Sequence, residues 1–297
     1  MSMEFDAKVI VSEAERLIKN YGKKSANPAE VEDLNKEGIT SLMAGGEGNK
    51  EALKFFLQAL EKSGGNRELR AQCFVNLGDF LRRVVGAPKE ALHMFCQAED
   101  LTRSLATKAR IKAMEAMVYM LKTHLGQNDL EGVQKNIAAL KEAIKLARLA
   151  RQEDLEKAKK TEGLAFHRLI GTVCHWGNDE QKVRAVFEID RFLTRLDPDS
   201  PEIPQMKYSR AMILMAKEPE VSGPIFLENA LYWEKEPTNA CGQFVLAADC
   251  YVRLSRKTLA KTCLAKAEEI MSAGFSHTNV GFEVKIYERV KAALGKS

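Results

Sequence analysis

One spacing pattern recurs along the sequence and constrains the fold more than any other feature. Six times a small or slender residue is followed four positions later by a bulky one and three positions after that by a third, usually small residue. The first residues of successive triplets are 39, 42, 50, 40 and 37 positions apart. Self-similarity at this period is typical of stacked helical repeats. The triplets are Ala52/Phe56/Ala59, Ala91/Phe95/Ala98, Val133/Ile137/Leu140, Val183/Phe187/Asp190, Gly223/Leu227/Ala230 and Ala260/Leu264/Ala267.

Helix start and stop signals lie between the triplets. Asn27-Pro28 followed by Glu30 is a helix start, and Gly86-Ala87-Pro88 is a break between two helices. No stretch shows the sustained alternation of polar and apolar residues that strands require. We therefore expect one continuous all-α array of antiparallel helix pairs, about six repeats long. Its predicted parts are an amphipathic N-terminal helix and linker (1–27), the repeat array (28–278) and a C-terminal capping helix (279–297).

Composition is ordinary for a folded protein, but the charges are unevenly placed. Apolar residues make up 45% of the chain, charged residues 29%, and the formal net charge is +4. Residues 101–160 contain thirteen basic and seven acidic side chains, an excess of six positive charges. Two interpretations stay open: these are solvated helix faces, or they form a basic patch for an acidic partner. The small net charge makes nucleic acid an unlikely partner.

The cysteines and histidines do not form a recognisable catalytic or metal motif. The six cysteines include no Cys-x-x-Cys pair, and they lie in apolar helical stretches without a leader sequence before them. Pairs such as His93 with Cys96 supply too few ligands for zinc, and nothing local marks Cys174 as a nucleophile beside His167. No apolar run approaches the roughly eighteen residues of a membrane helix. We expect a cytoplasmic protein that is not an enzyme and uses no cofactor or metal.

Two of the repeats resemble a known family. The second repeat has a first-helix set of Phe74, Leu77, Gly78 and Leu81, which is followed by Ala91, Phe95 and Ala98 after one inserted residue. The last repeat has the corresponding set of Phe244, Ala247, Ala248 and Tyr251, which is followed by Ala260, Leu264 and Ala267 without an insertion. This pattern resembles the tetratricopeptide repeat, which places an aromatic residue, Leu, a small residue and Tyr on a first helix, then Ala, a bulky residue and Ala on a second. The longer steps are similar to those of extended scaffold repeats and of the soluble vesicle-fusion attachment proteins (SNAP adaptors).

The resemblance implies a right-handed superhelical solenoid whose concave face, lined by first helices, holds a peptide or helix of a partner protein. It implies partner-binding positions on the first helices of the second and third pairs. A terminal-carboxylate clamp, as used by some members for chaperone tails, is disfavoured because Asn35 and Ile39 stand where its Lys and Asn are expected. The partner-binding residues predicted in this way are Asn76, Asp79, Arg83, Lys108, Arg110 and Lys112.

Three functions follow from these expectations. The first is a non-enzymatic adaptor or scaffold that binds a peptide or helical segment, acidic or phosphorylated, in the concave face. The second is a SNAP-like trafficking adaptor that grips a coiled-coil bundle, suggested by the overall length and the Glu13-Ala14-Glu15-Arg16 start. The third is an RNA-binding helical repeat, which requires a continuous basic groove. The identity of the partner and the oligomeric state stay open.

Overall fold

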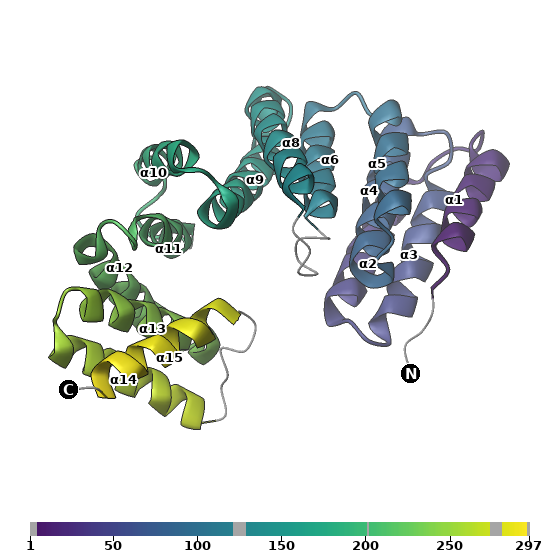
Figure 1. The fold of residues 1–297 in the computed structure, drawn as a ribbon. Helices are drawn as coiled ribbons and strands as arrows, with labels where there is room; N and C mark the ends of the chain where they lie inside the picture. The colour runs from purple at the N-terminus through teal and green to yellow at the C-terminus, as the bar shows by residue number, and fades with distance from the viewer. Residues whose placement is uncertain (1–4, 121–128, 201, 274–280, 296–297) are drawn as a thin grey trace. The chain divides into compact units, whose positions relative to one another are not determined.

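The computed structural model describes residues 5–120, 129–200, 202–273 and 281–295. Within these residues the chain forms fourteen α-helices and no β-strand, which confirms the all-α prediction (Figure 1). The chain divides into two compact units, residues 1–169 and 170–297. The sequence predicts one repeat array over residues 28–278, and the boundary between the units falls inside its 50-residue step between the third and fourth triplets.

The first unit is built from neighbouring helix pairs. Helices α2 and α3, α4 and α5, and α6 and α8 pack as pairs, while α2, α4 and α6 also contact one another in order. Helix α1 packs against the second helices α3 and α5. The elements are α1 (Ala7–Tyr21), α2 (Pro28–Ala44), α3 (Gly48–Lys62), α4 (Arg67–Phe80), the π-helix η1 (Leu81–Val85), α5 (Pro88–Leu101), α6 (Leu105–Tyr119), α8 (Leu130–Leu149), the 3-10 helix η2 (Ala150–Gln152) and α9 (Leu155–Trp176), which crosses into the second unit.

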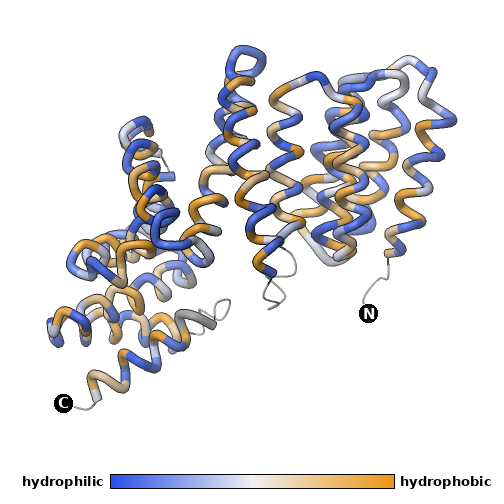
Figure 2. The backbone as a smooth tube through the Cα atoms, turned by 45° about the horizontal axis from the view of Figure 1, so that its top comes forward, coloured by the Kyte–Doolittle hydropathy of each residue, from blue (hydrophilic) through white to orange (hydrophobic). Residues whose placement is uncertain are grey.

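Side-chain caps fix where several of these helices begin. The Asn27 side chain accepts a hydrogen bond from the backbone N–H of Glu30, as the sequence predicts. Asn66 caps α4 and Ser104 caps α6 in the same way. Along the helices, hydrophobic and hydrophilic residues alternate in the manner of amphipathic segments (Figure 2). The caps therefore set the ends of the helices, and the amphipathic pattern sets the faces that they bury.

Close contact between paired helices depends on two glycines in equivalent places. Gly38 of α2 lies against the ring of Phe56 of α3, and a Cβ atom on Gly78 of α4 would lie 2.5 Å from Cε1 of Phe95 in α5. Both rings are fully buried. A methyl group at either glycine would require the ring to move, in a core that is packed as densely as an organic crystal. The glycines thus allow the helices of a pair to approach each other.

Gly78→Ala tests this packing. We expect the free energy of unfolding to fall by about 1 kcal/mol, because the overpacking penalty exceeds the gain in helix propensity. Gly171→Ala is the matched control, since Gly171 is also helical but has no atom within 4 Å of the added Cβ. There we expect a gain of about 0.5–1 kcal/mol. Urea denaturation measures both, and equal shifts in the two variants would contradict the packing argument.

Most of the repeating triplets are buried, and one is not. Ala91, Phe95 and Ala98 are fully buried, and the first, third and sixth triplets are buried, while Leu227 of the fifth is half-buried. The fourth triplet is the exposed one, since Val183 and Phe187 of α10 are 68% and 62% exposed.

The orientation of α10 explains the fourth triplet. This helix buries Ala185 and Ile189 instead, and these belong to a face turned away from the predicted one. Asp190 forms an ion pair with Arg210 of α11, 2.8 Å apart. A charged residue in the third position of the triplet thus pairs at the surface, and the opposite face of the helix packs inward.

The second unit has its own core. It contains α10 (Asp179–Leu193), α11 (Glu202–Leu214), α12 (Pro219–Tyr232), α13 (Pro237–Arg253), α14 (Lys257–Ser272) and α15 (Gly281–Gly295). Helix α13 is central, since it packs against α12, α14 and α15.

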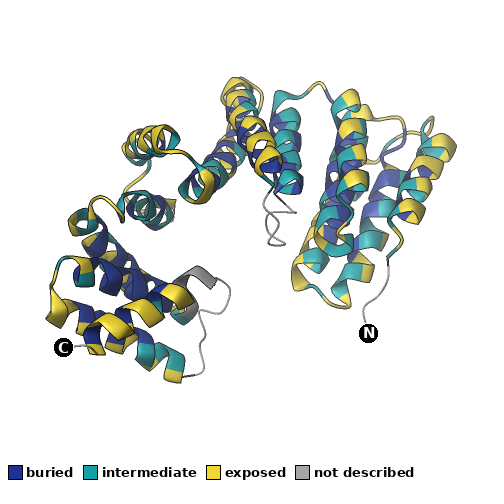
Figure 3. Cartoon of the chain, viewed as in Figure 1, coloured by how far each residue is buried: buried dark blue, intermediate teal, exposed yellow. Residues whose placement is uncertain are grey.

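The helices at the two ends of the chain are amphipathic. Helix α1 buries Ile10, Ala14 and Leu17, whereas Val9 is 63% exposed. Helix α15 buries Ile286, Val290 and Leu294. Exposed residues cover the other face of each helix (Figure 3). None of the helices in the described part of the chain is both long and apolar enough to cross a membrane.

Candidate functional site

A groove of about 560 Å³ opens in the first unit. Its wall comes mainly from α2, α4, α6 and α9, with one side chain from α3. Helices α2, α4 and α6 are the first helices of three successive pairs, and α9 follows the third pair. The lining residues are Ile39, Leu42, Met43, Phe56, Glu68, Gln72, Val75, Asn76, Asp79, Arg83, Ser104, Ala106, Thr107, Arg110, Ala113, Met114, Asp154, Lys157, Lys160, Thr161 and Leu164.

A row of hydrogen bonds joins α2, α4 and α6. Nδ2 of Asn76 donates to Oδ1 of Asn35 at 2.7 Å, and Nη2 of Arg110 donates to Oδ1 of Asn76 at 2.8 Å. Both asparagines are buried. Burial lowers the pKa of the Arg110 guanidinium, and the charge of Asp79 raises it. The row holds three neighbouring helices in register at the groove.

Apolar side chains form another part of the groove. Met43 is 77% exposed, and Ile39 and Leu164 are 39% and 37% exposed. Val75 also lines the groove and is fully buried. When a partner covers water-exposed apolar groups on a concave surface, the removal of their surface from water stabilises the complex. The groove therefore offers apolar contacts from both α2 and α9.

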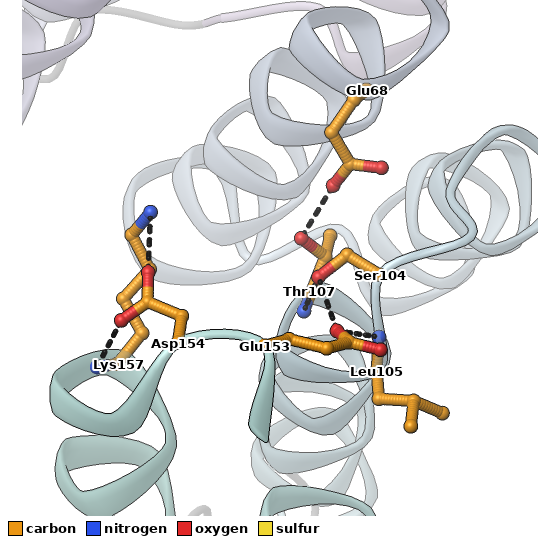
Figure 4. Close-up of polar contacts among 7 residues, drawn as sticks. All are labelled: Glu68, Ser104, Leu105, Thr107, Glu153, Asp154 and Lys157. Atoms are coloured by element: carbon orange, nitrogen blue, oxygen red, sulfur yellow. Dashed lines mark hydrogen bonds and ion pairs between the residues drawn. The ribbon is translucent and has the colours of Figure 1, made fainter. Parts of the chain in front are cut away.

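The acidic side chains of the groove already have partners. Glu68 accepts hydrogen bonds from the hydroxyls of Thr102 and Thr107, each at 2.6 Å. Figure 4 shows the Thr107 contact next to a second cluster, in which Glu153 accepts from the backbone N–H of Leu105. In the same view Asp154 accepts from the backbone N–H of Lys157 and pairs with its ammonium group at 3.0 Å. These contacts fix the starts of α6 and α9.

Cationic side chains are less completely paired. Arg83 and Arg82 both bind Asp79, through Nε of Arg83 at 2.9 Å and Nη2 of Arg82 at 2.6 Å. Lys160 of α9 is exposed and has no ion-pair partner among the residues that the structure describes. The groove lining contains four cationic and three acidic side chains. The net charge of the side chains that line the groove is therefore positive, and this favours an acidic partner.

The structure brings four of the six predicted site residues together. Asn76, Asp79, Arg83 and Arg110 line the groove. Lys112 of α6 instead binds Glu99 at 2.8 Å and Glu115 at 3.1 Å.

The other two predicted residues, Lys108 and Lys112, are half-buried and do not line the groove. Lys112 and Asn76 both make polar contacts within the chain.

Sequence reasoning missed the contribution of α9. Lys157, Lys160 and Leu164 lie on one face of that helix and line the groove. Their spacing of three and then four residues is a helical-face signal that could have identified them. The preceding helix, α8, is twenty residues long, and this extra length hides the repeat register that would mark α9 as a first helix.

Among the described residues, the thiols of Cys174 and Cys250 are not activated as nucleophiles. Burial raises the pKa of Cys174 to about 12 and that of Cys250 to about 12, so both are protonated near neutral pH. Burial also lowers the pKa of His167 and of His175. Among the described residues no group of three or more His, Cys, Asp or Glu side chains is placed to hold a metal ion.

No family model matches the chain, and no curated protein is similar enough in sequence to count as a relative.

Proposed function

We propose that the protein is a non-enzymatic adaptor that binds a peptide or helical segment of a partner protein in the groove of its first unit. The single observation that carries this proposal is a groove lined by α2, α4, α6 and α9, with exposed apolar side chains between fixed polar groups. The proposed architecture is a right-handed, tetratricopeptide-like solenoid. This is the architecture whose first helices form a binding surface.

Preorganisation is the proposed mechanism. The buried row from Asn35 through Asn76 to Arg110 holds the wall in one geometry, so the protein loses little conformational entropy when a segment binds. Apolar side chains of the partner cover Met43 and Leu164, and acidic ones approach Lys160. The acidic side chains Glu68, Asp79 and Asp154 in the same groove disfavour a nucleic-acid backbone.

Leu164→Asp tests the proposal. Peptides are selected from a displayed random library on the wild-type protein, and their affinities for the variants are measured by fluorescence anisotropy. We expect Leu164→Asp to weaken binding at least about tenfold, which corresponds to about 1.4 kcal/mol, because it places a charge against the apolar part of the bound segment.

Leu130→Asp is the matched control, since Leu130 of α8 is 62% exposed and lies outside the groove. It should leave the affinities unchanged. Peptides that bind both variants as tightly as the wild type would show that the groove is not the binding site.

A further inference from the structure

Two arginines bind one carboxylate where α4 ends, and a third lies near enough for their charges to act on it. Nε and Nη2 of Arg82 donate to Oδ1 of Asp79, and Nε of Arg83 binds Oδ2. Both oxygens of Asp79 are therefore occupied. The Arg83 side chain is 43% exposed and lines the groove, so its remaining N–H groups can reach a ligand there. The third arginine comes from a helix far along the chain.

That third arginine is Arg168 of α9. It follows Leu164 by four residues and Thr161 by seven, so it lies on the same face of α9, one turn beyond the last residue that lines the groove. Its Nη1 atom is buried and has no hydrogen-bond partner among the described residues. Burial lowers the pKa of Arg168, the charges of Arg82 and Arg83 lower it further, and Asp79 raises it. An unpaired buried donor of this kind costs free energy unless a ligand accepts from it.

A π-helical turn contains two of these arginines. Residues 81–85 form η1, directly after α4. It lies between Gly78 and Ala91, where the second repeat has its one inserted residue. Arg82 and Arg83 follow Asp79 by three and four residues, so both side chains can reach its carboxylate from one side of the helix. Single π-turns within α-helices are frequently found at functional sites.

We propose that the arginine cluster of Arg82, Arg83 and Arg168 binds a phosphate monoester carried by the partner segment. Three guanidinium groups and the single carboxylate of Asp79 leave an excess of two positive charges, which matches the charge of about −1.5 to −2 on a phosphorylated side chain. Guanidinium groups bind phosphate oxygens in bidentate geometry, and Nη1 of Arg168 supplies a donor already removed from water. The inference rests on the adaptor function proposed above, because the phosphate arrives on a protein segment.

Capped phosphoserine is the probe, with capped glutamate and capped serine for comparison. Binding is followed by NMR through the arginine side-chain N–H signals of the full-length protein. We expect phosphoserine to bind at least about tenfold more tightly than glutamate, and Arg83→Gln or Arg168→Gln to weaken it at least about fivefold. Lys141→Gln removes an exposed charge of α8 and should change nothing.

Each outcome has a defined meaning. Glutamate binding as tightly as phosphoserine overturns the proposal, and so does unchanged affinity in Arg83→Gln. If Arg168→Gln does not fold, as checked by circular dichroism, Arg83→Gln decides alone, because its side chain is partly exposed. Phosphoserine binding without any groove-dependent peptide supports the arginine cluster and removes the adaptor function. If peptides bind in the groove but phosphoserine does not bind, the adaptor function is supported and the arginine cluster is not a phosphate site.

Discussion

Phe95→Ala is expected to lower the free energy of unfolding by about 3–5 kcal/mol, the range for deleting a buried aromatic ring. The ring is fully buried and lies against Gly78, so its removal leaves a cavity between α4 and α5. Neighbouring side chains cannot fill that cavity without leaving their own contacts. Urea denaturation followed by circular dichroism measures the loss.

Phe187→Ala is the matched control for this prediction. Phe187 occupies the same place in the fourth triplet as Phe95 does in the second, but it is 62% exposed. Its loss should change the free energy of unfolding by no more than about 0.5 kcal/mol. Equal losses in the two variants would contradict the orientation of α10 described above.

Asn76→Ala is expected to cost about 2–3 kcal/mol of stability and to weaken peptide binding in the groove. The change leaves two buried groups without a partner, Oδ1 of Asn35 and Nη2 of Arg110. Each unsatisfied buried group costs about 1–3 kcal/mol. Binding should weaken because α2, α4 and α6 are no longer held in one geometry.

Two further variants separate this polar row from a general effect of losing an asparagine. Asn20→Ala alters an exposed residue of α1 and should leave stability nearly unchanged. Asn76→Asp keeps an acceptor for Arg110, so it should cost less than Asn76→Ala. A cost for Asn76→Asp as large as that for Asn76→Ala would show that the contact with Arg110 contributes little.

Part of the candidate site could be predicted from the sequence. Asn76, Asp79 and Arg83 are expected at a binding surface because the tetratricopeptide resemblance assigns that surface to the first helices, and all three line the groove. Within the second repeat, their spacing leaves them outside the apolar positions, and this part of the argument depends only on the helical period. The same argument cannot say whether a polar side chain faces a ligand or another part of the chain. Lys112, for example, binds Glu99, thirteen residues away on the preceding helix.

The sequence by itself determined the helices, their caps and the recurrent pairing of a small residue with a bulky one. These depend on interactions within a few residues, or between neighbouring helices joined by short turns. Five of the six triplets are buried or half-buried for this reason.

Only the tertiary structure decided the orientation of α10, the division at residue 169 and the placement of Arg168 within reach of the charges of Arg82 and Arg83. Each of these depends on which of several available faces a helix buries against a distant partner. The helical period sets those faces but does not choose among them.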